Sequence, residues 1–231
     1  MADLLRLACA DIEAPPLFHA SGGGQDRRGF EPDVGRAVAH ALGRPLEWRF
    51  VPWSEMLPSV RSGDADGVLC GQGITTQRLE LVDFTRPYAV FNESVLVRAG
   101  SGIESPEGLR GLRVGAIAGS TNMTLTETFE AAEPVAFSGT SDDVFGEMLE
   151  ALRSGDVDAV VDDDVALIPV ADDPEFAIAF TAATRNRWGI AVSKDEPELR
   201  RELDGALERM HAGGELAAIW SRWMPSLPYP L

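Results

Sequence analysis

The chain has few of the residues from which several common kinds of site are built. Its 231 residues include only two cysteines, Cys9 and Cys70, and three scattered histidines. Two cysteines do not make a disulfide framework, and no histidine has the spacing to a cysteine or carboxylate that metal sites require. The sequence contains neither a G-x-S-x-G motif nor a phosphate-binding P-loop. We therefore expect no metal and no cofactor.

Positive charge is also scarce. Twenty lysines and arginines stand against 37 acidic residues, and Lys194 is the only lysine. The net charge of −17 argues against nucleic acid and anionic membranes, which select basic patches. No apolar run approaches the roughly 20 residues of a membrane span. The start, Met1-Ala2-Asp3, lacks the basic and apolar regions of a leader, so the protein is either cytoplasmic or begins after a removed leader.

One nine-residue pattern occurs twice, at residues 61–69 and 153–161. Both copies read R-S-G-D-x-D and continue with small and apolar residues. The segment before each copy has helical apolar periodicity, and the glycine is typical of the left-handed residue just past a helix. The short apolar run that follows indicates a buried strand. A helix–glycine–strand unit used twice predicts two similarly built α/β lobes.

The segments after these two strands are candidates for a binding site. Open α/β sheets bind ligands beyond the carboxyl ends of their strands. Cys70-Gly71-Gln72-Gly73 follows the first strand, and three aspartates at 162–164 follow the second. The glycines supply backbone groups and room, and we expect Cys70 to pack rather than to react.

Further motifs lie in a specific order along nearly the whole chain. They are G-F-E-P-D-V at 29–34, S-G-D-x-D at 62–66, G-I-T-T-Q-R at 73–78, V-D-F-T-x-P-Y at 82–88, V-G-x3-G-S-T at 114–121 and G-I-A-V at 189–192. Their order and spacing resemble the family 3 extracellular solute-binding proteins, the amino-acid-binding components of ABC transporters. The resemblance implies a two-lobed α/β fold of the type II periplasmic-binding-protein kind. Each lobe is then a mostly parallel sheet flanked by helices, and the lobes close on a small ligand by hinge motion.

The resemblance also implies boundaries and partners. We expect lobe 1 to comprise residues 1–91 and 190–231, and lobe 2 to comprise residues 92–189, with hinge crossovers near 91–95 and 185–190. An ABC permease is the implied membrane partner, and the protein is expected to be a monomer. Its implied location is periplasmic, or extracellular and anchored at the surface, with the leader already removed.

Three positions match the family's ligand contacts. Arg78 matches the arginine that holds the ligand carboxylate, and a guanidinium fork suits a carboxylate; the alternative is a surface arginine. Ser120 and Thr121 begin a predicted helix whose free N–H groups favour an anion, although either residue is also an ordinary cap. Asp163 matches the acid that takes the ligand ammonium, and its alternative is a solvated acidic turn.

Other candidates come from the same comparison of positions. Trp53 lies where the family often places an aromatic ring on the ligand, or it packs in the core. Glu13 replaces the family's other usual aromatic residue, which favours a ligand with a cationic or amidine-like nitrogen, unless it is an exposed loop acid. Asp11 is a weaker candidate in the same loop. Cys70, Gly71 and Gly73 offer fewer hydroxyl groups than the serine-rich version common in amino-acid binders.

These residues predict a substrate-binding component of an ABC importer. Its ligand is expected to be a small zwitterion, either a polar or cationic amino acid or a compatible solute such as ectoine, held in the cleft between the lobes. One alternative is a dehydratase acting on prephenate or arogenate, with Glu13 or Asp163 as general acid. A second alternative is a ligand-sensing domain that signals without transport.

Overall fold

The computed structural model describes residues 4–231, so the first three residues, on which the leader expectation rests, lie outside that range. The chain forms two compact units. Unit 1 contains the described residues through Ile12, Pro16–Val90 and Asn186–Leu231, and unit 2 contains Glu13–Pro15 and Phe91–Arg185. Within residues 4–231, no helix has both the length and the apolar character needed to cross a membrane.

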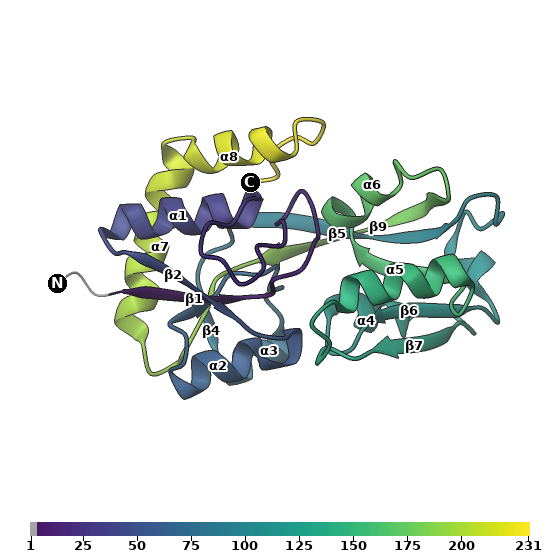
Figure 1. The fold of residues 1–231 in the computed structure, drawn as a ribbon, viewed down its shortest axis with the longest axis horizontal. Helices are drawn as coiled ribbons and strands as arrows, with labels where there is room; N and C mark the ends of the chain where they lie inside the picture. The colour runs from purple at the N-terminus through teal and green to yellow at the C-terminus, as the bar shows by residue number, and fades with distance from the viewer. Residues whose placement is uncertain (1–3) are drawn as a thin grey trace. The chain divides into compact units, whose positions relative to one another are not determined.

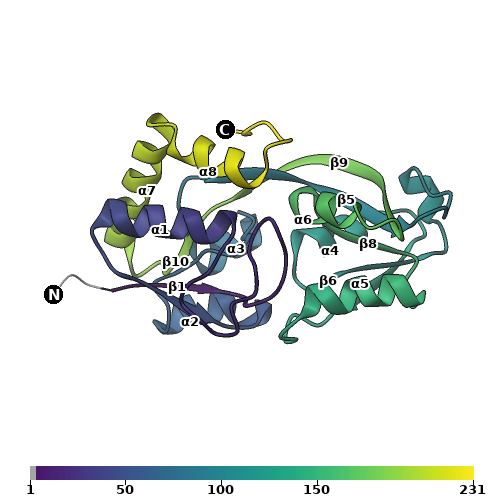
Figure 2. The ribbon, with the colours of Figure 1, turned by 45° about the horizontal axis from the view of Figure 1, so that its top comes forward.

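Unit 1 is built on a five-stranded sheet in the order β2-β1-β3-β10-β4. Its strands are β1 (Leu5–Cys9), β2 (Leu46–Phe50), β3 (Gly67–Val68), β4 (Asp83–Phe84) and β10 (Ala191–Val192). Its helices are α1 (Phe30–Leu42), η1 (Trp53–Glu55), α2 (Met56–Ser62), α3 (Thr76–Leu81), α7 (Pro197–Ala212) and α8 (Glu215–Trp223). Helices α1, α7 and α8 pack together on one side of the sheet, and α2 covers the other side (Figures 1 and 2).

Unit 2 repeats this plan with a sheet in the order β7-β6-β8-β5-β9. Its strands are β5 (Ala89–Arg98), β6 (Arg113–Ile117), β7 (Glu133–Phe137), β8 (Ala159–Asp163) and β9 (Phe176–Trp188). Its helices are η2 (Pro106–Leu109), α4 (Thr121–Thr126), α5 (Val144–Ser154) and α6 (Asp164–Val170). Both α4 and α5 pack on β6 and β8, and the buried core joins α4 to the sheet through Met123, Val114 and Val161.

The predicted α/β class with two similarly built units is confirmed. In each sheet one strand pairs in parallel with two neighbours, β1 with β2 and β3, and β6 with β7 and β8. A strand from later or earlier in the chain then joins antiparallel, β10 beside β3 and β5 beside β8. The parallel parts bring the carboxyl ends of three strands to one edge of each sheet, which is where α/β proteins bind ligands.

The second aspartate of each repeat copy binds the arginine near the start of the neighbouring strand. The Asp66 carboxylate accepts hydrogen bonds from the Arg6 backbone N–H at 2.7 Å and from Arg6 Nη2 at 2.5 Å. The Asp158 carboxylate accepts from the Arg113 backbone N–H at 2.9 Å and from Arg113 Nη2 at 3.2 Å. We call this arrangement the aspartate clamp. It explains why the same sequence pattern occurs once in each unit.

The glycine of each copy completes the clamp. Gly63 ends α2 with φ 82°, and Gly155 ends α5 with φ 86°, a left-handed conformation that disfavours other residues. The carbonyl oxygen of each glycine accepts a hydrogen bond at 2.8 Å from the clamped arginine, Arg6 or Arg113. The turn therefore places both a carboxylate and a carbonyl group at the first residues of the neighbouring strand, β1 in unit 1 and β6 in unit 2.

Replacing a clamp aspartate should destabilise either unit to a similar degree. Asp66→Ala and Asp158→Ala each leave a strand N–H and a guanidinium without their acceptor, so we expect a loss of about 1–3 kcal/mol in the free energy of unfolding. Urea denaturation followed by circular dichroism measures it. The controls are Asp64→Ala and Asp156→Ala, whose exposed carboxylates accept from the nearby hydroxyl groups of Ser62 and Ser154, with expected changes within about 0.5 kcal/mol. Equal losses for all four variants would contradict the clamp.

Candidate functional site

In unit 1 the structure brings together three of the predicted ligand residues. Arg78 lies in α3 and is only 8% exposed. Its Nη1 donates to the Gly73 carbonyl oxygen at 2.9 Å, and its guanidinium carbon lies 5.4 Å from the centroid of the Trp53 ring. Thr75 caps α3 by accepting from the Arg78 backbone N–H. The arginine is therefore held between an indole face and a backbone carbonyl, a setting in which its fixed donors suit a carboxylate.

A buried glutamate lies behind the Cys70–Gly73 segment. Glu31, in the first turn of α1, is 1% exposed, and its Oε1 accepts from the Gly71 backbone N–H at 2.7 Å and the Tyr88 hydroxyl at 2.5 Å. Burial raises the pKa of Glu31 to about 7, although both hydrogen bonds oppose the rise. Gly71 has φ 60°, so the bond from its N–H helps fix a left-handed turn in the segment predicted to face the ligand.

The two cysteines are separate thiols that belong to the same buried region of unit 1. Cys70 accepts from the Ala10 backbone N–H at 3.3 Å, and burial raises its pKa to about 12. Cys9 accepts from Nη1 of the buried Arg27 at 2.8 Å, and burial raises its pKa well above the ordinary value. Neutral buried thiols are poor nucleophiles, so Cys70 packs beside the site and has no reactive character.

The first loop of unit 1 is closed by Asp11. Its carboxylate accepts from the backbone N–H groups of Ser21 and Gly23 at 2.6 and 2.5 Å. Burial acts to raise the pKa of Asp11, but these hydrogen bonds outweigh it and lower the pKa overall. The structure thus gives Asp11 a loop-closing contact. Glu13, two residues on, is exposed and groups with unit 2.

In unit 2 the carboxyl end of β6 leads directly into α4. Gly119 has φ 72° and reverses the chain, and Ser120 is the N-cap. The Ser120 hydroxyl accepts from the Met123 N–H at 3.0 Å and donates to the Ile117 carbonyl oxygen at 2.7 Å. Ser120 is therefore an ordinary N-cap, which is the alternative to a ligand contact that the sequence left open. Thr121 is half-buried at the first helical position, where backbone N–H groups lack helical acceptors.

The carboxyl end of β8 carries acids that are almost fully buried. Asp162 and Asp163 are 7% and 8% exposed, and Glu93 on β5 lies opposite Asp163 in the antiparallel register. Burial raises the pKa of Asp162 to about 7, and the nearby Glu93 adds to the rise. Burial also raises the pKa of Asp163 well above its usual range, with Asp162 and Glu93 contributing. Asn122 in α4 donates to Asp162 Oδ1 at 3.3 Å.

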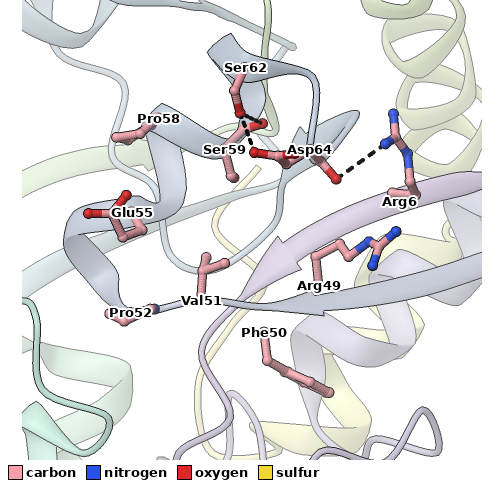
Figure 3. Close-up of a pocket in the computed structure, with 10 residues that line it drawn as sticks. All are labelled: Arg6, Arg49, Phe50, Val51, Pro52, Glu55, Pro58, Ser59, Ser62 and Asp64. Atoms are coloured by element: carbon pink, nitrogen blue, oxygen red, sulfur yellow. Dashed lines mark hydrogen bonds between the residues drawn. The ribbon is translucent and has the colours of Figure 1, made fainter.

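A separate pocket of about 690 Å³ lies in unit 1 along α2 and the edge strand β2 (Figure 3). Arg6 and Asp64 line it, and Arg6 Nη1 donates to the Asp64 carbonyl oxygen at 3.3 Å. None of the predicted ligand residues lines this pocket. Of its two arginines, Arg6 is already engaged by the aspartate clamp and Arg49 pairs with Glu47 at 3.0 Å, so the pocket is not a candidate for the ligand.

Sequence reasoning missed Glu31, Glu93 and Asn122. The sequence motif at 29–34 includes Glu31, but an acid in a first helical turn is usually a solvated partner of the helix dipole. Glu93 lies in an alternating strand segment whose burial depends on a partner about 70 residues later. Asn122 directly follows Thr121, so its position at the predicted helix start could have indicated that it lies near the site.

Two α/β units with polar groups at the carboxyl ends of their strands define a two-lobed solute-binding protein. The chain belongs to the bacterial extracellular solute-binding proteins, family 3, whose sequence model matches residues 6–226. The predicted substrate-binding role in an ABC transport system is confirmed by relatives of that kind. A glutamine-binding protein of an ABC transporter from Bacillus subtilis (strain 168) is 30% identical over 87% of this chain and 74% of its own length.

Solved structures agree with the family. An ancestral arginine-binding protein bound to arginine is 29% identical with a TM-score of 0.86, and covers 96% of this chain and 98% of its own. The ancestral arginine-binding protein solved with glutamine is 32% identical, again with a TM-score of 0.86, over 97% and 99% of the two chains. The ancestral amino-acid-binding protein AncCDT-1, a precursor of cyclohexadienyl dehydratase, is 26% identical with a TM-score of 0.82, over 95% and 94%.

Glu31 should make the stability of unit 1 depend on pH. Its pKa rises from 4.5 to about 7 on folding, so the folded state keeps a proton that the unfolded state loses. Stability from this group is complete below pH 4.5 and is lost as pH rises through 7, a change of about 3 kcal/mol at 1.36 kcal/mol per pH unit. Glu31→Gln keeps an acceptor oxygen but cannot ionise. We expect urea unfolding to show the variant gaining about that amount over the wild type between pH 4.5 and 8.

The matched control for this measurement is Glu80→Gln, which changes an exposed acid of α3 in the same unit. It should leave the pH profile of unfolding as in the wild type. Parallel profiles for the wild type and Glu31→Gln would mean that Glu31 does not hold its proton in the folded state.

Proposed function

We propose that the chain binds a small amino acid with a cationic nitrogen and delivers it to an ABC permease. Arg78 of unit 1 takes the ligand carboxylate, with Trp53 beside it, and Asp163 of unit 2 takes the nitrogen. The helix start at Thr121 offers further N–H groups to the carboxylate. Both sets of residues bind the same ligand, and the backbone changes on binding near 91–95 and 185–190, at the predicted crossovers.

The observation that carries this proposal is the setting of Arg78. Arg78 is 8% exposed, its Nη1 donates to the Gly73 carbonyl oxygen, and its guanidinium carbon lies 5.4 Å from the centroid of the Trp53 ring, so the fork is held in one position. A guanidinium fork held in this way suits the planar carboxylate of a ligand. The relatives solved with arginine or glutamine have ligands that carry such a group. We place the working protein outside the cytoplasm, where this family delivers solutes to permeases.

The enzyme alternative rests on one solved relative. AncCDT-1 is both an amino-acid-binding protein and a precursor of a cyclohexadienyl dehydratase. Asp163, with its raised pKa, has the protonated state that a general acid needs. We propose that the chain is nevertheless a binding protein. Incubation with prephenate and arogenate should give no decarboxylated aromatic product, and turnover would replace this proposal with the enzyme.

Removing the guanidinium should abolish binding without unfolding the protein. A thermal-shift screen with L-arginine, L-glutamine, L-histidine and ectoine first identifies a ligand, since a hundredfold excess over Kd adds about 2.7 kcal/mol of stability. For Arg78→Ala we expect a loss of at least about a hundredfold in affinity, as a charged hydrogen-bonded pair is broken. Arg78→Lys keeps the charge but loses the fork and should recover only part of it. Arg78→Ala binding with wild-type affinity would rule out the carboxylate assignment, and a response to ectoine alone would favour the compatible-solute alternative.

A further inference from the structure

Unit 2 contains more buried acid than one ligand ammonium requires. Glu93 is 1% exposed, and it lies directly opposite Asp163 across the β5–β8 pair, an arrangement that places like charges at the closest cross-strand distance. Asp162 precedes Asp163, and its Oδ1 accepts from the Asp163 backbone N–H at 2.7 Å. These three side chains form what we call the acid cluster. Three carboxylates this close and this buried cannot all be ionised near neutral pH.

Asn122 is an independent indication that the cluster accepts hydrogen bonds from a bound ligand. Its side chain is 5% exposed and points to the cluster, where Nδ2 donates to Asp162 Oδ1. The Asn122 Oδ1 atom is buried and has no hydrogen-bond donor, and the same is true of Asp163 Oδ1. A buried acceptor without a donor is costly. A bound group that brings N–H donors would satisfy both atoms, and positive charge suits the surrounding acids best.

Arginines of three surrounding elements of unit 2 are already paired with acids. Helix α6 adds Asp164, whose carboxylate accepts from Asn92 Nδ2 at 3.1 Å, and α4 contains no ionisable residue. Arg98 of β5 and Arg113 of β6 bind Asp158. Arg153 of α5 binds Glu150 and Glu175, and Glu147 of the same helix accepts from Ser141. Arg185 of β9 donates its backbone N–H to Asn92. Within residues 4–231, the charges acting on Asp162 and Asp163 are other acids.

We propose that a cationic nitrogen of the ligand and a proton compete for the acid cluster, so that unit 2 accepts an ammonium or guanidinium group by releasing a proton. This inference rests on the proposed function, because it assumes that the ligand nitrogen meets Asp163. In the exchange a carboxyl O–H bond of the cluster breaks, the proton passes to solvent, and N–H donors of the ligand bind the resulting carboxylate. A ligand without a cationic nitrogen cannot drive this exchange, so the cluster also selects the class of ligand.

Proton competition has a definite sign. Burial and the nearby Glu93 raise the pKa of Asp162 to about 7, so the cluster holds a proton below about pH 7 and acid opposes the incoming cation. For one proton with that pKa, affinity should be about tenfold weaker at pH 6 than at pH 8, and about half a proton should be released per ligand at pH 7. Isothermal titration of the full chain with L-arginine and with L-glutamine measures both quantities. Titration at pH 7 in two buffers of different ionisation enthalpy counts the protons.

Two variants locate the proton. Asp162→Asn removes one acid without removing Asp163, and we expect it to bind both amino acids with a pH 6 to pH 8 ratio within about twofold. Glu93→Gln removes the acid opposite Asp163 and should flatten the ratio in the same way, which keeps the test open if either variant folds poorly. The matched control is Glu31→Gln, because Glu31 is a buried acid of unit 1 whose pKa is also about 7. Its ratio should stay near tenfold.

The outcomes separate the inference from the proposed function. Equal affinities at pH 6 and pH 8 for the wild type would overturn proton competition while leaving amino-acid binding intact. A tenfold ratio that persists in both Asp162→Asn and Glu93→Gln, or that disappears only in Glu31→Gln, would also overturn it by placing the proton elsewhere. If neither amino acid binds at either pH, the proposed function fails first and the inference fails with it.

Discussion

Both halves of this chain depend on one local arrangement, the aspartate that binds the start of an adjacent strand through its carboxylate. The same aspartate donates its backbone N–H to the carbonyl oxygen of the clamped arginine, at 2.8 Å for both Asp66 with Arg6 and Asp158 with Arg113. These contacts set the parallel register, Leu7 opposite Gly67 and Val114 opposite Ala159. A slip of one residue would turn every side chain of a strand to the other face. The positions of Cys70 and Asp163, a few residues further on, follow from that register.

Each unit contains a buried acid, and the two acids differ in what binds them. Glu31 in unit 1 receives two short hydrogen bonds on Oε1 from its own unit and holds a backbone turn in place, while its Oε2 has no donor. Asp163 in unit 2 has a buried oxygen without a donor, as does its neighbour Asn122. Buried polar groups in folded proteins are usually satisfied, and Asp163 and Asn122 leave two unsatisfied acceptors together at the carboxyl end of a strand, where α/β sheets bind ligands. Burial alone would not distinguish the two acids, since it raises the pKa of both.

The sequence was sufficient where the signal is local. The repeat, its left-handed glycines and the strands after them could be predicted because helix ends and short apolar runs are encoded by adjacent residues. The motif order also identified Arg78 and Asp163 as site candidates. The long strand β9 was not predicted, since its residues are mostly half-buried or exposed and carry no strong apolar alternation. The burial of Glu93 and Glu31, and the arginine partners of the clamps, depend on contacts between residues 40 to 70 positions apart, which a single sequence does not show.

The position of β10 in the first sheet has a consequence for synthesis on the ribosome. β10 pairs with β3 on one side and β4 on the other, yet it is made more than 100 residues after both. Until residue 192 emerges, β3 has an open edge and β4 has no partner strand. Open edges can pair with other chains, so the nascent protein has an interval of exposure to misassembly. Unit 2, whose residues beyond the first loop are continuous in the chain, is complete before that interval ends.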